Sequence, residues 1–192
     1  MQFTNDPLLD LRRTFRRPSV GRPREASLLG LLRFDLQQFH ATKGTAPAAV
    51  VAPLLAALGN CVGLELLAKY WSGGHDVPSS TVVDFLTSVG GLSQPDAEVL
   101  LQFRNSLAHG YGLGTRRRKD SKVFSFALDT GGTGSSPLIS RRPANAYVIN
   151  LPSLERLFDF ATHQCRSAIA RDPVRLGQFQ VCVRNLGEIR IT

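Results

Sequence analysis

The residue types best suited to chemistry lie together in one short segment, residues 104–111, which has the sequence RNSLAHGY. Arg104 is followed directly by Asn105, and His109 comes five positions after the arginine. An arginine presents paired N–H donors that match phosphate oxygens, whereas a histidine titrates near neutral pH and can accept or donate a proton. Taken singly, each residue is more often a surface or core group. Together with an orienting amide, they suit a reaction at a phosphate group.

A helix is predicted to position this segment. Ser93 is a plausible N-cap with Asp96 three residues later, and Gly110 is a natural stop directly after His109. The apolar residues Val99, Leu100, Phe103 and Leu107 would form the buried side. Asn105 and His109, four residues apart, would share a face, and the long side chain of Arg104 could reach round to it. At the helix end, the macrodipole would raise the pKa of His109 and favour its cationic form.

The pattern Arg-x4-His, with Asn after the arginine, Ala before the histidine and Gly after it, resembles the signature of HEPN domains. Helix order extends the resemblance over residues 26–171, but only the segment 104–111 is specific. The resemblance implies a metal-independent ribonuclease in which the RNA 2′-hydroxyl attacks the adjacent phosphate and leaves a cyclic phosphate. It also implies a homodimer with two motifs facing one cleft. In that scheme Arg104 binds the phosphate, His109 handles the proton and Asn105 orients them.

Two further residues are candidates for this site. Tyr111 extends the motif in a way that resembles the HepT toxins of HEPN–nucleotidyltransferase pairs, in which the antitoxin adds AMP to this tyrosine. Those toxins are shorter and lack the Gly-rich insertion and the basic arm of this chain, and Tyr111 packing against the inserted strands is an equal alternative. Glu65 lies in an apolar helix and would need Arg104 or His109 as a partner if buried, or would otherwise lie at the solvent edge.

Charge and composition favour a polyanionic partner. The 192-residue chain has a formal net charge of +8, which favours association with RNA. A basic turn formed by Arg116, Arg117, Arg118 and Lys119 is the candidate RNA-binding element. The three cysteines show no CxxC spacing, so we expect no metal site, no cofactor and no disulfide framework. We expect the protein to be located in the reducing cytoplasm. The uncharged run 45–64 contains two prolines and two glycines and predicts a core helix rather than a membrane span.

The predicted architecture is an all-α, HEPN-like bundle of four to five helices. Residues 1–25 would form a basic N-terminal arm, 26–172 the helical domain and 173–192 a C-terminal extension. The expected helices span about 26–43, 48–71, 80–89, 93–109 and 152–171. A β-hairpin insertion at 115–151 would pair strands 122–128 and 146–151, and a second small hairpin is expected at the C-terminus.

These observations predict a metal-independent RNA endonuclease, with a toxin–antitoxin or anti-phage defence system as its context and a cognate antitoxin as a possible partner. One alternative is a non-catalytic HEPN-like module that binds RNA, a nucleotide or a protein through the same arginine and histidine. Another is a purely structural role, in which the motif makes only hydrogen bonds within one chain.

Overall fold

The computed structural model describes residues 5–16, 27, 29–30, 32–33, 35–36, 51–74, 76–109, 113–116, 122–131 and 135–186. Only the backbone is described at positions 51, 52, 109, 115 and 116. The predicted helix 26–43 therefore lies largely outside the described residues, although positions 29–30, 32–33 and 35–36 are helical.

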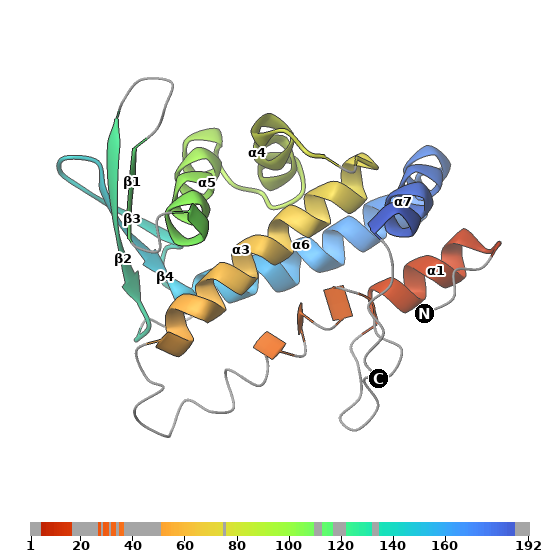
Figure 1. Ribbon diagram of the computed structural model, residues 1–192, viewed down its shortest axis with the longest axis horizontal. Coiled ribbons are helices and arrows are strands. Elements are labelled where there is room, and N and C mark those ends of the chain that lie inside the picture. The colour runs from red at the N-terminus through yellow and green to blue at the C-terminus, as the bar shows by residue number, and fades with distance from the viewer. Residues whose placement is uncertain are drawn as a thin grey trace.

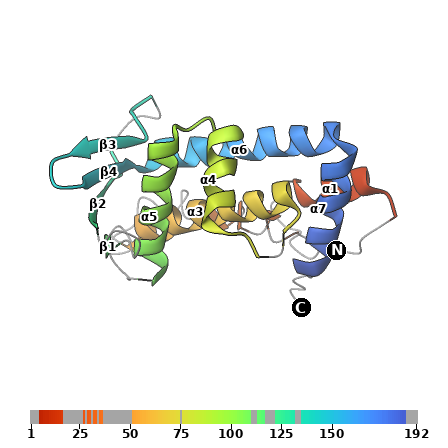
Figure 2. The same ribbon diagram turned by 90° about the horizontal axis from the view of Figure 1, so that it is seen from above.

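Two long helices form the centre of the molecule. α3 (Val51–Ser72) and α6 (Leu151–Arg171) lie side by side and run in the same direction (Figures 1 and 2). Their close approach depends on Gly63, because a Cβ at this position would lie 2.5 Å from Cε2 of Phe158. α3 is apolar on most of its sides, as expected for a helix packed between other helices. Within the described ranges, no helix is both long enough and apolar enough to cross a membrane.

A second layer of helices covers one side of this pair. α4 (Ser79–Ser88) and α5 (Gln94–His109) pack against each other and against α3 (Figure 1). The predicted start of α5 is confirmed, because Ser93 Oγ donates to Asp96 Oδ2 at 2.7 Å and accepts from the Asp96 backbone N–H at 3.3 Å. α4 begins after Pro78, which is its N-cap residue and makes no side-chain cap bond.

A four-stranded mixed sheet lies at the end of the bundle beside α5 (Figures 1 and 2). The strands β1 (Gly114–Arg116), β2 (Val123–Asp129), β3 (Ile139–Arg142) and β4 (Ala146–Asn150) are arranged in the order β1-β2-β4-β3. The inner face carries aromatic side chains, and the rings of Phe126 and Phe103 are 5.3 Å apart between centroids. The sheet therefore helps to hold the helix that carries the motif.

The all-α prediction is wrong because this sheet is a substantial part of the fold. The predicted hairpin is also wrong: β2 and β4 pair as predicted, but they are parallel, so they cannot be two arms of a hairpin. The hairpin is formed by β3 and β4, through a turn at 143–145 in which Ala144 and Asn145 have positive φ. A short turn closes at a smaller entropic cost than the longer connection between β2 and β4. No strand was predicted at the position of β3.

The C-terminal hairpin is a further incorrect prediction. Residues 173–186 form helix α7 (Pro173–Leu186), and residues 187–192 lie outside the described residues. Alternation in QFQVCVR suggested a strand, but the buried residues are Phe179, Cys182 and Val183, which have helical spacing. The available signal was Asp172 before Pro173, because Asp172 Oδ1 accepts from the N–H of Val174 at 2.9 Å.

The first described helix packs on α7 at the far end from the sheet. α1 (Pro7–Thr14) begins at Asp6, whose Oδ1 accepts from the N–H groups of Leu8 and Leu9. Leu11 and, just after the helix, Phe15 are buried in the core. This part of the predicted basic arm is therefore built into the folded body.

Candidate functional site

Arg104 and Glu65 form an ion pair that joins α5 to α3. Glu65 Oε2 accepts from Nη2 of Arg104, and the two side chains are 23% and 24% exposed, respectively. The partly buried Glu65 thus has the arginine partner that the sequence analysis offered as one of its alternatives. Because about three quarters of each side chain is covered, solvent screens this pair less than it would a surface pair. The pair holds the guanidinium in place between α5 and α3.

Asn105 is the second acceptor for the same guanidinium. Its Oδ1 accepts a hydrogen bond from Nη1 of Arg104 at 3.1 Å. The arginine side chain therefore reaches round the helix to its sequence neighbour, as the sequence predicts. Glu65 and Asn105 together fix both terminal nitrogens of Arg104, so little rotamer freedom is left to lose when a further acceptor arrives.

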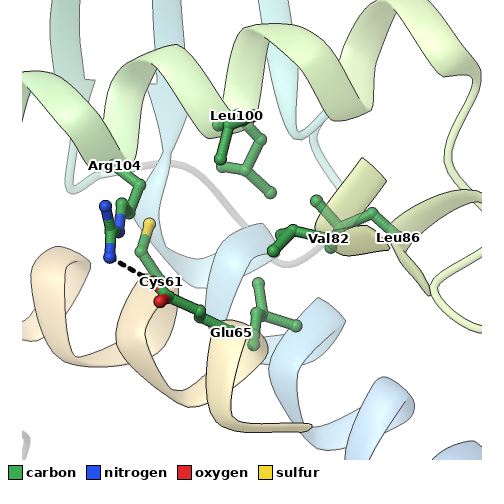
Figure 3. Close-up of a pocket in the computed structure, with 8 residues that line it drawn as sticks. Cys61, Glu65, Val82, Leu86, Leu100 and Arg104 are labelled. Atoms are coloured by element: carbon green, nitrogen blue, oxygen red, sulfur yellow. Dashed lines mark hydrogen bonds and ion pairs between the residues drawn. The ribbon is translucent and has the colours of Figure 1, made fainter. Parts of the chain in front are cut away.

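A small apolar pocket opens beside this pair, between α3, α4 and α5. Figure 3 shows Cys61 and Glu65 on α3 facing Arg104 on α5, with Leu100 beside them. Val82 and Leu86 of α4 close the other side. Cys61 was not among the site residues predicted from the sequence. The available signal was its position one helical turn before Glu65, which places both on one side of α3.

The Cys61 thiol stays protonated at neutral pH in this environment. Burial raises the pKa of Cys61 from 9.0 to about 12, and the positive charge of Arg104 offsets only part of this rise. The carboxylate of Glu65 raises the pKa further. Since the thiolate is the reactive form of cysteine, the protonated Cys61 thiol serves as a small apolar wall beside the ion pair.

Several predicted site residues lie outside the described residues, in full or in their side chains. The backbone of His109 ends α5, which puts this residue about one turn after Asn105, but its side chain lies outside the described residues. Tyr111 is outside them too. For the predicted RNA-binding turn, the backbone of Arg116 ends strand β1, and Arg117, Arg118 and Lys119 are not described. The structure thus brings together Arg104, Asn105 and Glu65.

The described side chains include no group of three or more His, Cys, Asp or Glu residues that could hold a metal ion. All three cysteines, Cys61, Cys165 and Cys182, are free and buried.

In comparisons with known proteins, the chain matches no family model, no curated protein and no solved structure at a significant level.

Proposed function

We propose that the chain is a metal-independent RNA endonuclease of HEPN type that acts through Arg104, Asn105 and His109. The observation that carries the proposal is the guanidinium of Arg104, which Glu65 and Asn105 hold in place on the helix that ends at His109. A preorganised cation beside a proton-transfer group is what a phosphoryl transition state requires.

In the proposed reaction, the RNA 2′-oxygen attacks the adjacent phosphorus and the bond to the 5′-oxygen breaks. The 2′-hydroxyl loses its proton and the leaving 5′-oxygen gains one, and His109 takes part in this transfer. Arg104 stabilises the charge that develops on the non-bridging oxygens. The products are a 2′,3′-cyclic phosphate and a 5′-hydroxyl end.

In the proposed reaction, Glu65 orients the guanidinium of Arg104. Its carboxylate accepts from Nη2 of Arg104, so an incoming phosphate must share the guanidinium with Glu65 or displace it from one edge. Glu65 is therefore a positioning residue. The function is further proposed to require a homodimer in the cytoplasm, with two copies of the motif facing one cleft, and a cognate antitoxin within a toxin–antitoxin or anti-phage system.

The test compares parent protein with Arg104→Ala and His109→Ala on a mixed RNA pool in the presence of a metal chelator. The parent is expected to leave cyclic phosphate ends, and each variant to lose about a hundredfold or more in rate. Arg156→Ala is the matched control, because Arg156 is an exposed arginine on α6 outside the pocket. Equal cleavage by the parent and both site variants would contradict the mechanism.

A second candidate function is a non-catalytic module that binds RNA or a nucleotide. The ion pair favours this non-catalytic function, because Glu65 already binds Arg104 and the contact between them can be explained without catalysis. Intact folding and RNA binding without cleavage would select this function. In that case Glu65→Gln should tighten RNA binding, because it removes the carboxylate that competes for the guanidinium.

A further inference from the structure

A second basic site lies on the opposite side of the α3–α6 pair from Arg104. It is a groove between the end of α1, residue 33 and the middle of α6, lined by Phe15, Arg16, Arg33, Asp159, Thr162, His163 and Arg166. Figure 1 shows α1 below the α3–α6 pair and α5 above it, and in Figure 2, seen from above, α4 and α5 pass over the pair. The groove is thus separate from the site around Arg104, and none of its lining residues takes part in the proposed function.

The chemistry of the groove is that of an anion site. Among the described residues that line it are three arginines, Arg16, Arg33 and Arg166, and one carboxylate, Asp159, so these four side chains together carry a net positive charge. Asp159, His163 and Arg166 recur at helical spacing, so one face of α6 presents them together. Guanidinium groups that converge from different segments match the several oxygens of a phosphate better than the two oxygens of a carboxylate.

The three arginines differ in how they are held. Arg33 is fixed, because its Nη2 donates to Asp159 Oδ1 at 3.0 Å and its side chain is only 11% exposed. The side chains of Arg16 and Arg166 are exposed and have no hydrogen-bond or ion-pair partner among the described residues. One anchored and two available guanidinium groups can bind an incoming anion without breaking the surrounding packing.

The size of the groove sets the class of ligand. The cavity volume between these residues is about 400 Å³, within the range of about 300–1,000 Å³ typical of small-molecule sites. We propose that this groove binds a phosphate group carried by a nucleotide or by an RNA backbone, through Arg16, Arg33 and Arg166. Asp159 holds Arg33 in place and limits the affinity of the groove for anions.

The experiment uses the full chain with Arg104→Ala, which prevents cleavage and removes binding at the other site. Inorganic phosphate and AMP are titrated by NMR, and a labelled RNA oligonucleotide by fluorescence anisotropy. Arg166→Glu is expected to weaken binding of phosphate-bearing ligands by about tenfold or more. Arg171→Glu is the matched control, because Arg171 is an exposed arginine on the same helix, roughly 140° further round it.

A third variant keeps the test independent of folding defects. Asp159→Asn removes the competing carboxylate and is expected to tighten binding of the same ligands. Tighter binding of RNA than of AMP would identify the backbone phosphodiester as the ligand, and the reverse order a free nucleotide. The proposal is overturned if Arg166→Glu and Arg171→Glu weaken binding equally, or if Asp159→Asn fails to strengthen it.

Discussion

At the scale of single residues, the site depends on how one guanidinium is shared. Asn105 accepts from Nη1 of Arg104 and Glu65 from Nη2, so the arginine is oriented before any ligand arrives. Orientation in advance reduces the entropy lost on binding, whereas the carboxylate competes with an incoming phosphate for the same donors. Under the proposed function, the balance between these effects decides whether the site turns a substrate over or only binds it.

The raised pKa of Cys61 makes the free energy of unfolding depend on pH. Its folded-state pKa is about 12 because of burial, against 9.0 for the ordinary thiol. Below pH 9 the thiol is protonated in both the folded and the unfolded chain, so its contribution is fully present. Between pH 9 and 12 only the unfolded chain releases the proton, so the free energy of unfolding falls as pH rises.

Thermal unfolding measured from pH 8 to 11 should therefore show a falling midpoint above pH 9. Cys61→Ala should reduce the slope of this fall, although its midpoint at pH 8 will be lower because a cavity remains. An unchanged slope in Cys61→Ala would show that the thiol titrates normally in the folded chain.

At the scale of the elements, α5 is held at its start as well as by its buried side. The cap formed by Ser93 and Asp96 begins the helix, and Asp96 Oδ1 also accepts from Nη2 of Arg141 on β3 at 2.6 Å. The ring of Phe126 on β2 packs against Phe103 of α5. The sheet therefore supports the helix that carries Arg104.

Ser93→Ala is expected to lower the free energy of unfolding by about 1 kcal/mol, because the N–H of Asp96 loses its side-chain acceptor. Chemical denaturation with urea would measure the change. Ser80→Ala is the matched control, since Ser80 lies in the first turn of α4, which has no side-chain cap bond. A similar loss in both variants would show that the hydroxyl of Ser93 makes no capping contribution.

We expect substitution of two helical glycines by alanine to change the free energy of unfolding in opposite directions. At Gly63 an added Cβ would lie 2.5 Å from the ring of Phe158, whereas at Gly177 on α7 it would meet nothing within 4 Å. Gly177→Ala should stabilise the protein by up to about 1 kcal/mol through helix propensity. Gly63→Ala should destabilise it, because overpacking costs about 1–3 kcal/mol and exceeds that gain.

The two unfolding free energies should be measured under the same conditions. Stabilisation by Gly63→Ala would mean that α3 and α6 are not in the close contact described above.

At the scale of the whole molecule, three aromatic rings join segments far apart in the sequence. Phe15 after α1, Tyr70 on α3 and Phe179 on α7 have ring centroids 5.5–6.2 Å apart. All three side chains are buried. Burial also raises the pKa of Tyr70 above its ordinary value. This cluster makes the N-terminal helix part of the same core as the C-terminal one.

Phe15→Ala should lower the free energy of unfolding by about 3 kcal/mol or more, because it removes a buried ring from this cluster. Leu8→Ala is the matched control on α1, since Leu8 is 45% exposed, and its effect should be much smaller. Equal and small effects of both substitutions in urea denaturation would indicate that α1 is not docked on the body.

The sequence by itself determined the features that depend on local spacing. The helices near 48–71, 93–109 and 152–171, the cap at Ser93 and the reach of Arg104 to Asn105 follow from apolar period, capping residues and side-chain length.

Only the tertiary structure decided the features that depend on long-range packing. The parallel pairing of β2 with β4 requires β3 to form the hairpin, which the period of one strand cannot reveal. The segment QFQVCVR alternates like a strand but forms part of helix α7. Its buried residues Phe179, Cys182 and Val183 have helical spacing, because α1 and α3 offer a surface for that helical face. The choice of Arg104 as the partner of Glu65, and the convergence of Arg16, Arg33 and Arg166, likewise arose from segments brought together by folding.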